Sequence, residues 1–283
     1  MAICKGEILV SKIRKIFAVI DPTTDKQTAL TTAELIASQD SAVALHVYEA
    51  IYATTDNIDV DALQRVELSR HRAWVESLIA PIRIAGNDVT VEVEWTREWR
   101  DAIAPAAERA GADLIVKAAS SHSGAGRRLL KTSDWTLLRN SHCPVYLVKN
   151  DSIEAGANIL VALDMRRDDD LHNKLNDQVL EYGRGLVANI PGSSLHAVTA
   201  YPNSDNFVYP GDLAEKAGIE SNRAHAIEGS PESVIPEVAE STGANIVIIG
   251  TAAREGIKAA VIGNTVEKVL DAVDSDILTV NAG

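Results

Sequence analysis

The chain has 283 residues, 46% of them hydrophobic, and a net charge of −13 from 27 basic and 40 acidic side chains. This apolar content excludes an intrinsically disordered chain, and the acidic excess argues against a nucleic-acid partner, whose phosphates attract clustered cations. Its two cysteines are too few for a disulfide framework, and neither a signal peptide nor an apolar run of membrane-spanning length is found. We therefore expect a cytoplasmic protein with no membrane partner.

The sequence repeats itself. Residues 107–116 return 132 positions later as residues 239–248, and residues 16–21 match residues 159–164 at an offset of 143. Two copies of one unit of about 140 residues account for the whole chain, which is an ordinary domain size. Function therefore has to be considered once for each copy.

Short apolar runs alternate with longer segments of helical period, a pattern typical of βαβ units on a parallel sheet. In a first domain, residues 1–150, it predicts strands near 15–20, 42–48, 88–94, 113–118 and 144–149 and helices near 26–38, 59–84, 99–110 and 133–140. In a second domain, residues 156–283, it predicts strands near 158–163, 194–200, 224–228, 245–249 and 276–280 and helices near 171–189, 231–242 and 263–272, with a short helix near 212–217. Each copy is expected to be a doubly wound α/β domain, Rossmann-like or flavodoxin-like, with a five-stranded, mainly parallel sheet and helices on both faces.

The copies differ most between their second and third strands, where copy two has lost about 18 residues, most of its second helix. A sheet face that loses its covering helix must be covered by something else or stay open as a cleft. We favour cover by the neighbouring copy over an open ligand cleft. The apolar last strands, residues 145–148 and 277–280, also predict that the copies pack together into one body, a pseudo-dimer within a monomer.

Ligands of open parallel sheets bind beyond the carboxyl ends of the strands, and several glycines and polar residues of copy two fall there. The start of the last helix offers free N–H groups to an anion, although Gly-Asn-Thr is also an ordinary helix start. The candidate ligand- or nucleotide-binding residues are Asp164 after the first strand, Gly250 and Thr251 after the fourth, and Gly263, Asn264 and Thr265 at the last helix.

In copy one, Trp95 and Trp99 flank the end of the third strand and could stack on a ligand, although such residues are more often core or interface. The histidines and cysteines of the chain show no metal-ligand spacing, so no metal site is expected.

The stretches 250–256, 263–270 and 277–280 resemble the C-terminal signature of the universal stress protein family. The family's nucleotide motif is Gly, two residues, Gly, nine residues, Gly, then Ser or Thr. Gly250 and Gly263 match its outer glycines, whereas Ala253 replaces the middle one. An added methyl group hinders close approach of a phosphate to the backbone, so weak ATP binding is expected in copy two.

Copy one departs further from the motif. Ala118 and Lys131 stand where the outer glycines belong, and Asp134 places a carboxylate at the helix start. Such a carboxylate repels phosphate, so we expect no ATP binding in copy one. Residues 71–74 and 229–240 extend the resemblance to the whole chain, and they resemble the tandem, two-domain type of the family.

The resemblance implies a stress-response protein with no established catalytic residues. We predict a non-enzymatic protein that binds a small molecule or a protein partner, with no certain cofactor and with ATP bound on the order of 0.1 mM or more weakly. Two alternatives stay open, namely an ATP-binding protein with slow ATPase activity in copy two and a pure interaction scaffold.

Overall fold

The computed structural model describes residues 13–53, 59–119, 132–150, 155–251 and 264–281. Domain 1 contains β1 (Lys15–Val19), α1 (Thr28–Ala37), β2 (Ala44–Ile51), α2 (Val60–Ile84), β3 (Val89–Trp95), α3 (Trp99–Ala110), β4 (Leu114–Ala118), α4 (Thr132–Asn140) and β5 (Val145–Val148). Domain 2 contains β6 (Asn158–Ala162), α5 (Asp170–Asn189), β7 (Ser194–Tyr201), η1 (Ser204–Asn206), α6 (Pro210–Ala217), η2 (Ser221–Arg223), β8 (Ala224–Glu228), α7 (Pro231–Ser241), β9 (Ala244–Thr251), α8 (Asn264–Ala272) and β10 (Asp276–Asn281). The predicted helices and strands are thus confirmed, and the structure adds the two short 3-10 helices.

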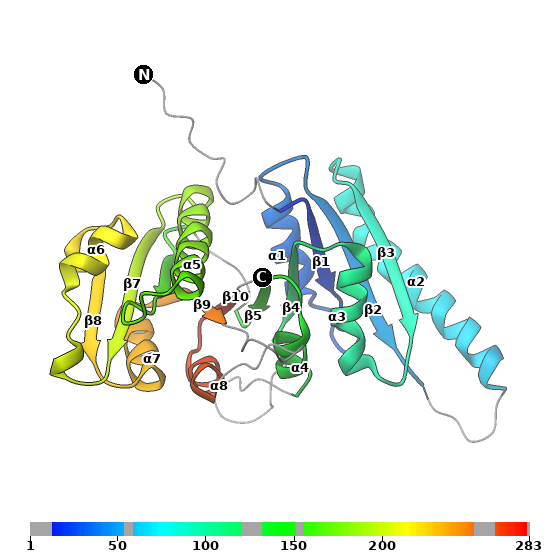
Figure 1. The fold of residues 1–283 in the computed structure, drawn as a ribbon. Helices are drawn as coiled ribbons and strands as arrows, with labels where there is room; N and C mark the ends of the chain where they lie inside the picture. Colours follow the sequence, from blue (N-terminus) through cyan, green and yellow to red (C-terminus); the bar gives the residue numbers. More distant parts are fainter. Residues whose placement is uncertain (1–12, 54–58, 120–131, 151–154, 252–263, 282–283) are drawn as a thin grey trace.

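The ten strands form one sheet in the order β3-β2-β1-β4-β5-β10-β9-β6-β7-β8 (Figure 1). Within each domain all neighbouring strands are parallel, as the predicted doubly wound fold requires. The two domains join through β5 and β10, which are antiparallel. Because the strand direction reverses at this junction, the carboxyl ends of the two halves point to opposite edges of the sheet.

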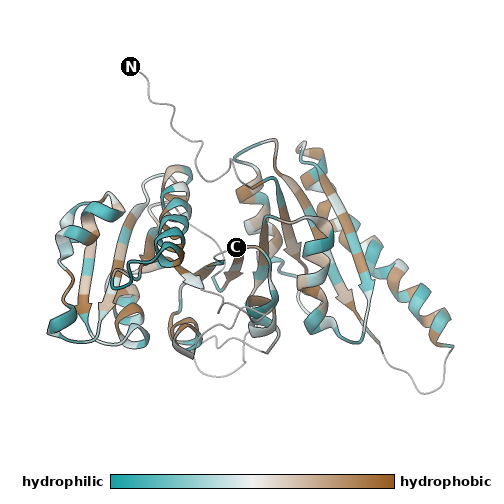
Figure 2. Ribbon diagram, viewed as in Figure 1, coloured by the Kyte–Doolittle hydropathy of each residue, from teal (hydrophilic) through white to brown (hydrophobic). Residues whose placement is uncertain are grey.

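Helices cover both faces of this sheet, and Figure 2 shows the brown apolar strands beneath helices whose outer faces are teal. One buried cluster packs α1, α2, α5 and α6 against one face, and a second packs α3, α4, α7 and α8 against the other. Strands covered on both faces need apolar residues on both faces, which explains the continuous apolar runs in the sequence.

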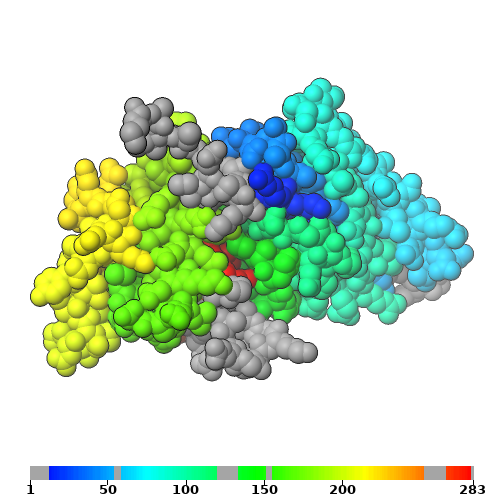
Figure 3. All heavy atoms as spheres, turned by 45° about the horizontal axis from the view of Figure 1, so that its top comes forward, coloured from blue at the N-terminus to red at the C-terminus, as the bar shows by residue number. Residues whose placement is uncertain are grey.

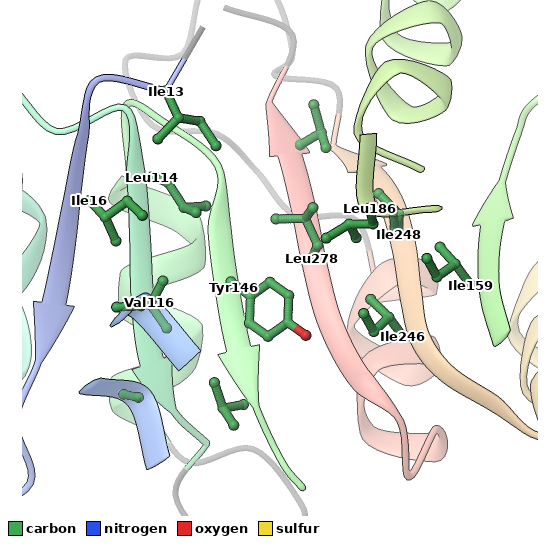
Figure 4. Close-up of a cluster of buried hydrophobic side chains, with 14 of the residues drawn as sticks. Ile13, Ile16, Leu114, Val116, Tyr146, Ile159, Leu186, Ile246, Ile248 and Leu278 are labelled. Carbon is green, nitrogen blue, oxygen red and sulfur yellow. The ribbon is translucent and has the colours of Figure 1, made fainter. Parts of the chain in front are cut away.

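The junction between the domains is a continuation of the core. Tyr146 on β5 lies opposite Leu278 on β10, and Val116 on β4 and Ile248 on β9 belong to the same buried cluster (Figure 4). The space-filling view shows one elongated body with the red C-terminal segment between the green surfaces of the two domains (Figure 3). The two apolar last strands therefore pair with each other, and the copies pack together through their sheet edges.

Side chains also cross the junction in a reciprocal way. Lys149 Nζ donates to the carbonyl oxygens of Leu270 and Val273 at the end of α8, at 2.8 and 2.6 Å. At the equivalent position of domain 2, Asn281 Nδ2 donates to the carbonyl oxygen of Ser141 after α4, at 2.9 Å. Each domain thus satisfies carbonyl groups at the end of the other domain's last helix, which those helices cannot satisfy alone.

The segment shortened in domain 2 corrects one sequence interpretation. In domain 2 the sheet face that a long second helix would cover is not covered by the neighbouring domain, and it is not left as an open cleft. Instead α6, eight residues long, buries Leu213, Ala214 and Ala217 in the same cluster as Leu195 and Ala197 of β7. A two-turn helix is enough because it has only the outer strands β7 and β8 to cover.

Helix ends follow the expected chemistry. α7 has Ser230 at the N-cap and Pro231 at its first position, and the Ser230 side chain makes no capping hydrogen bond. α3 ends at Gly111, whose φ of 66° is left-handed and suits glycine. Among the described residues, no helix has both the length and the apolar character needed to cross a bilayer.

Candidate functional site

The predicted residues of domain 2 come together only in part. Asp164 and Thr251 lie at the carboxyl ends of β6 and β9, which are neighbouring strands. Gly263 lies outside the described residues, as does the loop 252–262. Asn264 and Thr265 begin α8, as predicted for a helix start.

Asp164 is held within its own loop. Its Oδ1 accepts from the backbone N–H of Arg166 at 3.1 Å and from Arg166 Nε at 3.2 Å, and Arg167 Nε lies 3.6 Å from Oδ2. Asn176 bonds both the N–H and the carbonyl oxygen of Asp164, each at 3.0 Å. A ligand that uses this carboxylate therefore competes with two arginines.

Gly250 and Thr251 are already used by the fold. A Cβ at Gly250 would lie 2.4 Å from Leu175 Cγ, so the glycine allows α5 to pack closely on β9. The buried Thr251 Oγ1 donates to Asn281 Oδ1 at 2.7 Å, across to β10. Both residues thus have a structural role, independent of a nucleotide.

Domain 1 holds a ligand-sized opening, at a place where no binding site was predicted from the sequence. A cavity of about 790 Å³ lies at the carboxyl ends of β1 to β4, within the size range of small-molecule sites. It includes the point where the strand order of domain 1 switches, between β1 and β4. Its lining residues include Val19, Ile20, Tyr48, Ile51, Lys117, Ala118 and Val148 from or next to the strands, Glu67, Arg70 and His71 from α2, and Trp99 and Ile103 from α3.

Aromatic rings form one wall of this cavity. The rings of Trp95 and Tyr52 contact each other edge to face, with centroids 5.5 Å apart. Trp99 also lines the cavity and is 40% exposed. Tyr48 donates its hydroxyl to Glu94 Oε2 at 2.8 Å, and burial raises the pKa of this phenol above its ordinary value. The possibility of stacking at Trp95 and Trp99 is therefore the sequence signal that pointed to this cavity.

A buried acid supports the opposite wall. Glu49 on β2 has no exposed side-chain surface, and its Oε1 accepts from His71 Nδ1 on α2 at 2.7 Å. Glu49 Oε2 has no hydrogen-bond partner among the described residues. Burial raises the pKa of Glu49, and the hydrogen bond with His71 partly offsets this. A lone acid within the apolar run 44–51 was the signal that sequence reasoning missed.

A smaller hollow of about 300 Å³ adjoins the cavity and shares Arg70 and His71 with it. Arg70 lies 3.2 Å from His71 Nε2 and also forms an ion pair with Glu67. The hydroxyl-bearing residues Thr23 and Thr24 line both openings. The two spaces therefore meet at a cationic and hydroxylic edge.

The first turn of α4 is closed by an ion pair. The buried Asp134 carboxylate accepts from Lys117 Nζ at 2.6 Å, and Lys117 also lines the cavity. This places a carboxylate at the helix start, where a phosphate would need to bind. The expectation that domain 1 binds no ATP stays a prediction.

The strand order and the cavity beyond the carboxyl strand ends define a tandem pair of Rossmann-like domains with a small-molecule-sized opening. The sequence model described as the Universal stress protein family matches residues 12–149 and 205–281. The chain belongs to this family, which confirms the resemblance seen in its motifs.

Relatives extend over both domains. Universal stress protein E of Escherichia coli K12 is 30% identical over 295 residues, covering 94% of this chain and 93% of that protein. The homologue from Haemophilus influenzae is 27% identical and covers 94% and 97%. A functionally unknown protein of Pseudomonas aeruginosa PAO1 has a structure that superposes with a TM-score of 0.80, at 27% identity, over 95% of this chain and 92% of that chain. The tandem arrangement is thus shared with these proteins.

Proposed function

We propose that this universal stress protein is a non-enzymatic, cytoplasmic binding protein that holds a small, largely apolar molecule in the cavity of domain 1. The observation that carries the proposal is the cavity of about 790 Å³ with aromatic rings on one wall and polar groups on the other. Sites for small molecules combine apolar walls with a few placed polar groups in this way. The prediction of a small-molecule ligand is kept, and its proposed location moves from domain 2 to domain 1.

His142 and Cys143, which are adjacent in sequence, do not form a nucleophilic pair. Cys143 is buried, and burial raises the pKa of its thiol to about 12, so the reactive thiolate is suppressed. The His142 ring contacts the carbonyl oxygen of Ala112 at 3.1 Å. This supports a binding role over a covalent one.

A neutral bicyclic probe, 1-naphthamide, tests the proposal. Binding near Trp95 and Trp99 is expected to quench tryptophan fluorescence, and probe at about 100 times its dissociation constant should stabilise the protein by about 2.7 kcal/mol. Ala118→Leu fills part of the cavity and should weaken binding, whereas Ala73→Leu, an exposed position on α2, should leave it unchanged. Absence of binding to the unmodified protein, or equal binding to both variants, would contradict the proposal.

The pairing of β5 with β10 supports the further proposal that the chain acts as a monomer, since each domain already covers the other's last strand. Light scattering is expected to give one chain of 30.3 kDa. A mass of two chains at micromolar concentration would overturn this expectation.

A further inference from the structure

We propose that Arg70 and His71 form an anion-recognition edge of the domain 1 cavity, and that its ligand is a small amphipathic acid. The apolar body of such a ligand fills the aromatic cavity, and its carboxylate, or a similar monoanionic group, lies in the adjoining hollow. This inference rests on the proposed function, because it names the class of ligand for the same cavity.

The geometry places a polar end next to an apolar one. The cavity of about 790 Å³ and the hollow of about 300 Å³ share Arg70 and His71, so a molecule that extends from one space to the other passes these two side chains. Thr23 and Thr24 also line both spaces. The Arg70 guanidinium and the threonine hydroxyl groups at this boundary are donors suited to a carboxylate, and His71 Nε2 accepts from the guanidinium.

The boundary carries a balance of charge in a chain whose net charge is −13. The basic side chains Lys26, Arg70 and Lys117 line the cavity with Asp21 and Glu67, the hollow adds Asp25, and Lys117 is paired with Asp134. Asp21 Oδ1 already accepts from Thr23, and Glu67 from Arg70. Local potential in a cleft, and not net charge, decides which ligand enters.

Arg70 is available to a ligand at low cost. Its side chain is 67% exposed, and its ion pair with Glu67 joins residues three positions apart on one helix. Exposed pairs of this kind contribute little to stability, so the guanidinium can turn toward a carboxylate without much loss.

His71 is oriented by the acid beneath it. Because Glu49 Oε1 accepts from Nδ1, the ring is fixed with Nε2 toward Arg70 and the hollow. A buried carboxylate with one unpartnered oxygen is costly, and an apolar side chain would serve the core better. Glu49 is thus a positioning residue, and it acts through His71.

Three probes with one apolar body test the head-group preference, namely 1-naphthoate, neutral 1-naphthamide and cationic 1-naphthylmethylammonium. At pH 7, calorimetry is expected to give naphthoate at least about tenfold tighter binding than naphthamide, because hydrogen bonds to a charged group are the stronger ones. The cationic probe should bind no more tightly than the amide.

Substitutions at the boundary test which residues cause the preference for the anionic probe. Arg70→Ala and His71→Ala are each expected to weaken naphthoate binding about tenfold and naphthamide binding clearly less, and the remaining naphthamide binding shows that the variants are folded. Arg72→Ala is the matched control, since Arg72 is exposed on the same helix and lines neither opening, and it should change neither constant.

Equal affinity for naphthoate and naphthamide would overturn this inference and leave the proposed function intact. Equal loss of both probes in Arg70→Ala and His71→Ala would overturn it as well, since the residues would then shape the cavity without recognising charge. Failure of all three probes to bind would instead overturn the proposed function.

Discussion

The two domains share one strand order and differ in the wall above the carboxyl ends of their strands. In domain 1 the crossover after β2 is α2, 25 residues long, which brings Arg70 and His71 to the cavity. In domain 2 the corresponding crossover is α6, eight residues long, preceded by the exposed rings of Phe207 and Tyr209. The same strand order is thus combined with crossovers of very different length, and in domain 1 the long crossover supplies residues that line a ligand-sized cavity.

The largest expected effect compares two equivalent positions. Gly250→Ala places a Cβ against Leu175 and is expected to lower the free energy of unfolding by about 1–3 kcal/mol, the usual cost of overpacking. Ala118→Val, at the matching position beside the cavity of domain 1, should change it by less than about 0.5 kcal/mol. Urea denaturation measures both. Equal losses of unfolding free energy would show that the carboxyl ends of the strands are equally well packed in the two domains.

A second comparison concerns the reciprocal contacts across the junction. Lys149→Met removes two hydrogen bonds to carbonyl groups and is expected to cost about 1–3 kcal/mol. Burial lowers the pKa of Lys149 to about 8, below its ordinary value of about 10.4. The unfolded chain therefore binds this proton more tightly, and the unmodified protein gains stability as pH rises from about 8 to about 10.

Lys149→Met lacks that gain, so its loss of unfolding free energy relative to the unmodified protein should grow over this pH range. Asn281→Ala, the counterpart in domain 2, removes a group that does not titrate. Its loss of unfolding free energy should therefore stay constant over the same pH range. Denaturation at pH 7.5 and pH 9.5 compares the two. A constant deficit for Lys149→Met would show that Lys149 is not desolvated.

A smaller effect is expected at Glu49, whose counterpart in domain 2 is the neutral Thr199. Because burial raises the pKa of Glu49, the folded state binds its proton more tightly than the unfolded state. The stability that this group contributes falls as pH rises from the unfolded pKa of about 4.3 through the raised pKa of the folded state. Glu49→Gln should therefore be more stable than the unmodified protein by about 1 kcal/mol at pH 7, with a smaller difference near pH 4.

Thermal unfolding at the two pH values checks this. A Glu49→Gln variant that is less stable at pH 7 would show that the ionised pair with His71 stabilises the fold. The same variant keeps an acceptor for His71 Nδ1, so its loss of stability could not be assigned to a missing hydrogen bond.

The smallest effect is expected for ATP. Asp164 is engaged by two arginines and Thr251 by Asn281, so domain 2 should bind ATP on the order of 0.1 mM or more weakly, near −5 kcal/mol. Calorimetry with the full chain measures it. Micromolar binding that is lost in Gly263→Val would establish a nucleotide site in domain 2 and reverse the comparison between the domains.

Much of the fold could be predicted because each strand is an apolar run between helical segments, so β8 and even the short α6 were placed from sequence. The candidate site could not be predicted from the sequence, because it depends on contacts between residues that are far apart in the chain. Nothing in the spacing of Glu49, His71 and Trp95 shows that three elements bring them around one cavity. The packing of Leu175 against Gly250 is likewise a contact between distant positions, which the sequence pattern does not show.

The most direct test of the account is to locate a bound probe. A crystal of the full chain grown with 4-bromo-1-naphthamide would reveal the bromine by its anomalous scattering. The account predicts one bromine position in domain 1, within contact of Trp95, Trp99 or Ile103. A bromine bound in domain 2 or at the β5–β10 junction, with the domain 1 cavity free of probe, would contradict it.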